Sequence, residues 1–183
     1  MRFTVQSACR LITRSVTVAL MVAVLSGCGF RLQGDTPLPF DTLLVSVPAN
    51  TAFGADLRRA IRAASPKTKL LNDPTQTYQA NLQQVAESRT ARELSLNAQG
   101  RVEEYELTLS YTFRIVTANS EVILPNTTMV AQRNMPFDDR VIQAKEGEQA
   151  TMFKQMQASL VSRILRRISA PDIAERFASL QAK

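Results

Sequence analysis

The sequence predicts an α+β two-layer sandwich, with two amphipathic helices packed on one face of a four-stranded sheet in the order β-α-β-β-β-α. Two observations carry this prediction. Residues 105–115 alternate strictly, with Tyr, Leu, Phe or Ile at odd positions and Glu, Thr, Ser or Arg at even positions, as in a strand with one buried face. Residues 152–168 instead place apolar side chains three or four positions apart, as in an amphipathic helix. We therefore expect the helices to bury the odd-position face and to leave the even-position face for solvent or a partner.

The first two elements are a short strand and a helix. Residues 42–47 form a β-rich apolar run that Pro48 ends, which is typical of a buried strand. Asn50 or Thr51 can cap the helix that follows, and Pro66 ends it. The apolar stripe of this helix has helical spacing: Phe53, Leu57, Ala60, Ile61 and Ala64. Three arginines lie off the stripe and form either a solvated face or a contact for an anion or a protein: Arg58, Arg59 and Arg62.

Three further strands follow. Residues 78–97 favour a strand, but their alternation slips, which indicates a β-bulge or an edge position. The turn Asn97–Gly100 ends in a glycine that can adopt positive φ, and it leads into the strictly alternating strand. A second turn at residues 118–120 precedes a strand over residues 121–136, in which Pro125 indicates an edge position or a break.

The final helix is predicted to begin at about Glu146. Glu146 and Glu148 would then occupy its first turn, where acidic side chains suit the helix dipole. Three basic side chains in the last turns suit the dipole as well: Arg163, Arg166 and Arg167. Because Pro171 follows the apolar stripe, we expect residues 171–183 to form a frayed helical tail.

The N-terminus has the pattern of a secretory signal peptide. Residues 1–14 carry three arginines and no acid, and the apolar run 15–25 is shorter than the roughly 20 residues needed to span a bilayer. The tetrapeptide Leu25–Cys28 resembles the lipobox of bacterial lipoproteins. We therefore expect residues 1–27 to be removed and the sulfur of Cys28 to carry a lipid, although a chance cysteine in an ordinary signal would give the same letters.

The segment after Cys28 is predicted to tether the domain to a membrane. Residues 28–41 include Gly34 and two prolines and indicate an extended chain that leads to a domain at residues 42–170. In the lipoproteins of two-membrane bacteria that this segment resembles, Asp after the lipidated cysteine favours retention in the inner membrane. Gly29 stands at that position here and favours the outer membrane.

The composition argues against catalysis. The chain of 183 residues has a net charge of +6, and loss of residues 1–27 removes three of its 22 Lys and Arg and none of its 16 acids, leaving +3. This small excess weakens a nucleic-acid hypothesis but still suits an anionic partner. The sequence has no histidine, and with Cys28 lipidated no free thiol remains for nucleophilic or metal chemistry. We therefore predict no catalytic residue, no metal and no cofactor, while Ser/Lys and paired-carboxylate chemistry stay open in principle.

Three short motifs resemble one known family. The run Cys28–Leu32 after the lipobox, the dipeptide Glu104–Tyr105 that opens the alternating strand, and the stretch Ala144–Gln149 before the last helix are similar to motifs of the lipopolysaccharide-assembly lipoproteins of the LptE family. The resemblance covers nearly all of residues 28–170. Each motif is short, and their order and spacing together carry the resemblance.

The resemblance implies a function in lipopolysaccharide (LPS) export. LptE-like proteins are not enzymes; they sit as a plug inside the outer-membrane β-barrel LptD, support its assembly and help to deliver LPS to the outer leaflet. The polar even-position face suits contact with a polar barrel lumen. This chain would then lie on the periplasmic side of the outer membrane, anchored by its lipid.

The resemblance also implies two LPS-binding cations. Lys145 matches the family's basic residue before the last helix. The family's second cation lies at the hairpin tip, where this sequence has Ala98, and Arg101 could supply the charge from the same tip. Either residue could instead be a solvated surface cation. An alternative function is an outer-membrane lipoprotein that acts as scaffold or pilot for another secretion or barrel-assembly machine.

Overall fold

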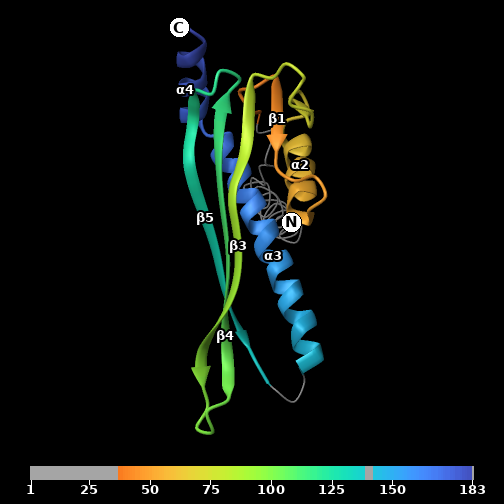
Figure 1. Cartoon of the computed structure of the whole chain (residues 1–183), viewed down its shortest axis with the longest axis vertical. Coiled ribbons are helices and arrows are strands. Elements are labelled where there is room, and N and C mark those ends of the chain that lie inside the picture. The colour runs from red at the N-terminus through yellow and green to blue at the C-terminus, as the bar shows by residue number, and fades with distance from the viewer. Residues whose placement is uncertain (1–36, 139–141, 183) are drawn as a thin grey trace, which may run out of the picture. The chain divides into compact units, whose positions relative to one another are not determined.

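The computed structural model describes residues 37–138 and 142–182, with side chains from residue 145 onward in the second range (Figure 1). Within these residues the chain forms a five-stranded sheet and three helices. Their order is β1 (Thr42–Ser46), α2 (Ala52–Ala64), β2 (Lys69–Leu71), β3 (Ala80–Leu96), β4 (Val102–Thr117), β5 (Val122–Pro136), α3 (Ile142–Ile168) and α4 (Pro171–Gln181). The predicted α+β class is confirmed, with one strand more than expected.

The additional strand is β2, and it lies at one edge of the sheet. The strands follow the spatial order β2-β1-β3-β4-β5. Strand β1 runs parallel to both β2 and β3, whereas β3, β4 and β5 are successive antiparallel neighbours. With three residues, β2 is too short to show a periodicity, and it becomes a strand only because α2 returns the chain beside β1.

The slip in β3 has both of the predicted causes. Gln84 pairs with Phe113 and Ala86 pairs with Thr112, so Val85 is an extra residue in the ladder. Strand β1 accompanies β3 only as far as Gln83, and beyond that point β3 forms an edge of the sheet. Strand β5 forms the opposite edge, and its own register shift lies beside Pro125, as a proline in a strand requires.

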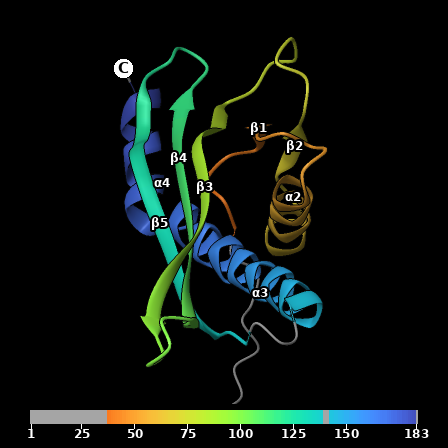
Figure 2. The same cartoon turned by 60° about the horizontal axis from the view of Figure 1, so that its bottom comes forward.

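The odd-position face of β4 forms the centre of the core, as predicted. Five of its side chains are at most 1% exposed: Leu107, Leu109, Tyr111, Phe113 and Ile115. Helices α2 and α3 cover this face (Figure 2). Phe53 of α2 stacks on Tyr111 with ring centroids 4.1 Å apart, and Leu160 and Ile164 of α3 are fully buried.

Helix α3 begins earlier than predicted. It starts at Ile142, so Glu146 and Glu148 lie beyond its first turn, which contains no acid, and the dipole argument for these two residues was wrong. Residues 137–145 contain no proline or glycine, so no helix-breaking residue lies directly before Glu146 to stop the helix from extending backward. At the other end, Arg166 and Arg167 do lie in the last turn.

The expected tail is a packed helix. Residues 171–181 form α4, in which Pro171 occupies the first turn and Ile173, Phe177 and Leu180 are buried. Phe177 packs edge-on against Phe40 with ring centroids 4.9 Å apart. Phe40 lies in the predicted tether, so the last part of that segment belongs to the core.

Arg58 departs from both predictions for the arginines of α2. Its side chain is buried and donates hydrogen bonds to the carbonyl oxygens of Val45 and Val47, both at 2.7 Å, and to Asn72 Oδ1 at 3.0 Å. Burial, together with the charge of Arg62, lowers the Arg58 pKa. Arg58 therefore links α2 to the end of β1, whereas Arg59 and Arg62 are exposed as a solvated face would be.

Candidate interaction surfaces at the sheet face and the hairpin end

The β3–β4 hairpin extends beyond the other strands and ends in a well-defined tip (Figure 1). Asn97 Oδ1 accepts hydrogen bonds from the backbone N–H groups of Gln99, at 3.0 Å, and Arg101, at 2.9 Å. Gly100 has φ +77°, which confirms the predicted role of this glycine. Ala98 and Arg101 are both exposed on the tip, so the tip presents the cation that the sequence predicted there. The capping role of the Asn97 side chain was not predicted.

Lys145 lies within helix α3 rather than before it. Its side chain is 18% exposed, and Nζ donates to Glu148 Oε2 at 2.7 Å, one turn further along the helix. Such an i,i+3 pair stabilises a helix only slightly, so the ammonium group stays available to a stronger acceptor. This ion pair was not predicted from the sequence, because Glu148 was expected to interact with the helix dipole and not with Lys145.

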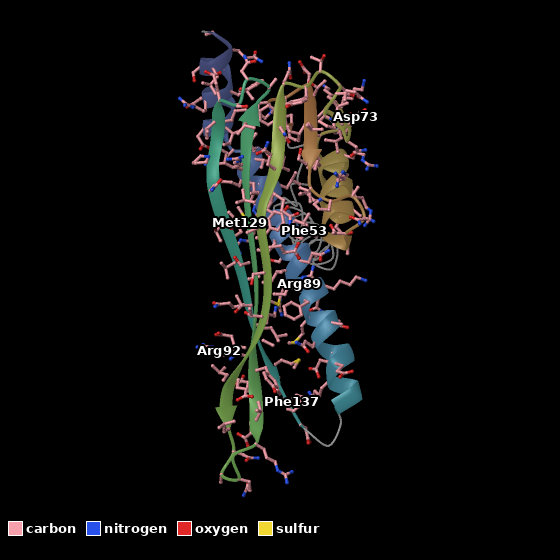
Figure 3. All side chains as sticks on the ribbon, viewed as in Figure 1. Phe53, Asp73, Arg89, Arg92, Met129 and Phe137 are labelled. Carbon is pink, nitrogen blue, oxygen red and sulfur yellow. The ribbon has the colours of Figure 1, made fainter. Side chains whose placement is uncertain are left out.

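Lys145 borders a cavity of about 300 Å³ between α3 and the part of the sheet nearest the β3–β4 hairpin tip. The residues that line it come from three strands, the following loop and the helix: Ala91, Tyr105, Met135, Phe137, Lys145, Glu146 and Gln149. Tyr105 and Phe137 meet edge to face with ring centroids 5.1 Å apart. In Figure 3, Phe137 lies between the sheet and α3. Nothing in the sequence pattern indicated this cavity.

The structure does not bring Arg101 and Lys145 together in one site. Arg101 is not among the residues that line the cavity, and it lies four residues before Tyr105. Four residues correspond to about 13 Å along a strand. The two predicted cations therefore occupy the same end of the domain as separate points of positive charge.

The even-position face of the sheet is polar and is not covered by the described helices (Figures 1 and 2). Its middle is made mostly of uncharged side chains: Thr90, Thr108, Ser110, Thr112, Thr128 and Gln132. The Thr112 and Thr128 hydroxyls are hydrogen-bonded to each other at 2.8 Å, and further along Arg92 Nη2 is 2.9 Å from Glu106 Oε1. The middle of this face therefore presents hydrogen-bond donors and acceptors with little charge, whereas Arg92 and Glu106 toward one end and Arg114 toward the other are charged.

Two arginines from the helices donate hydrogen bonds to backbone carbonyl groups of the edge strand β5. Arg163 Nη1 donates to the carbonyl oxygen of Val130 at 2.6 Å, and Arg176 Nε donates to that of Val122 at 3.4 Å. Charged groups on an edge strand hinder unwanted pairing with other chains. Arg163 was predicted to interact favourably with the helix dipole, but in the structure its side chain is hydrogen-bonded to the edge strand β5.

A polar seam joins the two covering helices to β3. Gln157 of α3 is buried; its Oε1 accepts from Arg89 Nη2 at 3.2 Å, and its Nε2 donates to Asp56 Oδ2 at 3.0 Å. Figure 3 shows Arg89 on the helix side of the sheet, opposite in direction to Arg92. Because both ends of the buried amide are satisfied, the seam fixes how α2, α3 and β3 sit against one another.

Two further observations bear on the site. In residues 37–138 and 142–182, no group of His, Cys, Asp and Glu side chains is arranged to hold a metal ion. No helix in this part of the chain has the length and hydropathy needed to cross a bilayer. Cys28, the predicted lipidation site, lies outside the described residues.

These features define a small α+β protein that presents an uncovered polar sheet face and a protruding hairpin beside an apolar cavity. A family model described as LptE, lipopolysaccharide-assembly, matches residues 40–168. The chain therefore belongs to the LptE family, and the resemblance noted in its sequence motifs is confirmed.

Relatives and solved structures agree with this assignment. An LPS-assembly lipoprotein LptE of Pectobacterium atrosepticum is 23% identical over 156 residues, covering 84% of this chain and 83% of that protein. Its counterpart in Photorhabdus laumondii is 24% identical over 169 residues, covering 88% of each. The solution structure of lipoprotein B from Nitrosomonas europaea has a TM-score of 0.66 and 33% identity, covering 78% of this chain and 91% of that one.

Proposed function

We propose that this chain is a lipid-anchored lipoprotein of the outer membrane that plugs and helps to assemble an LptD-type β-barrel and binds LPS for insertion into the outer leaflet. The curated relatives are named LPS-assembly lipoproteins, which supports the LPS-assembly part. In this proposal the protein is not an enzyme and uses no cofactor; it acts by contact.

The observation that carries the barrel contact is the uncovered even-position face. A plug in a water-filled barrel meets a polar lumen, so its outer surface must offer hydrogen-bonding groups rather than apolar ones. The hydroxyl and amide side chains around Thr108, Ser110 and Gln132 do so. Their low charge also spares the interface the cost of desolvating ions, which makes close packing against another polar wall feasible.

The membrane anchor of the proposal is a lipid on Cys28. The relatives are named as lipoproteins, and the lipobox of this chain supplies the cysteine. Two or more acyl chains hold a protein stably at a membrane, whereas one does so marginally. Replacement of Cys28 by Ala should release the protein from isolated outer membranes, which fractionation followed by immunoblotting would detect.

Site-specific photocrosslinking in the native membrane tests the barrel contact. A crosslinker at Thr108 or Ser110 should capture a barrel of the LptD type, identified by mass spectrometry. A crosslinker at Ala63, on the exposed side of α2, is the matched control for a different face. Failure of both sheet positions to capture the barrel would overturn this interface, and capture of another envelope machine would favour the scaffold or pilot alternative.

A further inference from the structure

The cavity beside Lys145 has walls suited to hydrocarbon. The edge-to-face rings of Tyr105 and Phe137 form part of the wall, and Met135, which is 2% exposed, also lines the cavity. Ala91 on β3 lines the opening with only a methyl group. Aromatic and thioether side chains of this kind adapt to a flexible apolar occupant.

The polar side chains that line this cavity lie mainly on its α3 side: Lys145, Glu146 and Gln149. The side formed by the strands and the following loop is apolar apart from the Tyr105 hydroxyl, because it consists of Ala91, Tyr105, Met135 and Phe137. A polar ligand against this apolar side would lose its hydration without gaining hydrogen bonds, whereas an apolar chain has no hydrogen bonds to lose there.

The rim of the cavity is polar and carries a cation. The Lys145 side chain is mostly covered, as expected when its methylenes lie along an apolar wall while the ammonium group stays at the surface. An ammonium group has three donors, and Glu148 takes one of them. The remaining donors can serve an anionic oxygen at the rim.

We infer that this cavity binds one acyl chain of the lipid A part of LPS while Lys145 contacts the adjoining phosphate. This inference rests on the proposed function and specifies which part of LPS binds at Lys145. A volume of about 300 Å³ lies at the lower end of the range for small-molecule sites, which suits one chain and not several. The pairing of an apolar cavity with a single cation at its rim matches an amphiphile whose charge lies next to its hydrocarbon.

The test fills the cavity without removing any wall. Ala91→Phe places a bulky ring at the opening, and Phe is well tolerated in strands. Ala86→Phe is the matched control. Ala86 is an exposed alanine of the same strand, and because it pairs with Thr112 it lies on the even-position face, away from the cavity. Both variants would be made in the full-length lipoprotein, and binding of purified LPS and of its fully deacylated derivative would be measured in a neutral detergent.

The expected result is selective for acylated ligand. Ala91→Phe should weaken binding of intact LPS by at least about tenfold, equivalent to losing the burial of roughly two methylene groups. Ala86→Phe should leave it unchanged, and binding of deacylated LPS should be the same in both variants. If the wild type binds no LPS, the proposed function fails; if it binds and Ala91→Phe binds equally well, only the acyl-chain inference fails.

A second readout does not depend on a variant. In the wild type carrying ¹³C-methyl methionine, the Met135 resonance should shift on addition of intact LPS, while that of Met156, a buried residue of α3 that does not line the cavity, should not. Deacylated LPS should leave both resonances in place. A Met135 signal that is unmoved by saturating LPS would contradict the inference.

Discussion

Lys145 and Glu148 form an ion pair of 2.7 Å at the rim of the apolar cavity, and this pair limits the charge that Lys145 offers to an anion. An anionic ligand at Lys145 has to compete with Glu148 for the same ammonium group. The carboxylate therefore lowers the affinity for a phosphate while it holds the lysine in position.

Glu148→Gln should strengthen LPS binding. Removing the competing charge of a partly exposed pair changes the free energy by up to about 1 kcal/mol, which corresponds to at most about fivefold in affinity. Titration of the full-length protein with LPS measures this effect. Glu175→Gln on α4 makes the same change in net charge far from Lys145, and an equal gain in both variants would show that only total charge matters.

Reversal of the two predicted cations should weaken LPS binding. Arg101→Glu and Lys145→Glu each replace attraction to lipid A phosphates by repulsion, and the double variant should lose more than either single variant. The loss should shrink at high salt, because screening reduces both effects. Unchanged binding by the double variant would remove Arg101 and Lys145 from the proposed site.

Arg58→Met should strongly destabilise the domain. The substitution leaves the carbonyl groups of Val45 and Val47 without the donors they have now, and each unsatisfied buried group costs about 1–3 kcal/mol. Urea unfolding followed by circular dichroism measures the change. Arg59→Met, which removes an exposed arginine paired with Asp56, should cost no more than about 1 kcal/mol. Similar losses in the two variants would contradict the structural role of Arg58.

Alanine at two helical glycines should act in opposite directions. A Cβ at Gly54 would collide with the carbonyl oxygen of Pro48, so Gly54→Ala should destabilise by about 1–3 kcal/mol. A Cβ at Gly147 meets nothing within 4 Å, so Gly147→Ala should stabilise by about 0.5–1 kcal/mol through helix propensity. Thermal unfolding of both variants gives the two signs, and a Gly54→Ala variant as stable as the wild type or more stable would refute the packing at Gly54.

The docking of α4 should depend on pH through Asp172. Hydrogen bonds from Arg167, both at 2.9 Å, hold the pKa of this carboxyl below its ordinary value of 3.8. A lowered folded-state pKa means that the carboxylate stabilises the fold above pH 3.8 and loses this effect as the pH falls through the folded-state value. Asp172→Asn should therefore speed amide exchange in α4 at pH 7, and the difference from the wild type should shrink as the pH falls below 3.8. A difference that does not shrink with falling pH would contradict this origin.

Much of the fold followed from local patterns. The alternation of residues 105–115, the cap at Thr51 and the turn ending in Gly100 all lie where the sequence predicts them. Each depends on a preference of a few neighbouring residues for one periodicity or one φ, which does not require knowledge of the rest of the chain. Arg101 lies on the hairpin tip as predicted, whereas Lys145 lies within α3 rather than before it, and the contact of either residue with LPS stays a prediction.

Other features depended on residues far apart in the chain. Strand β2 exists because it pairs with β1, α4 is ordered because Phe177 meets Phe40, and Arg58 is buried because the carbonyl groups of β1 end beside it. The cavity beside Lys145 likewise needs three strands and the start of α3 to meet. Periodicity in the chain specified which face of each element is apolar and which turns are possible. Only long-range packing decided which polar groups were buried with partners and where a space remained for a ligand, because those outcomes depend on the combined free energy of contacts that no short segment contains.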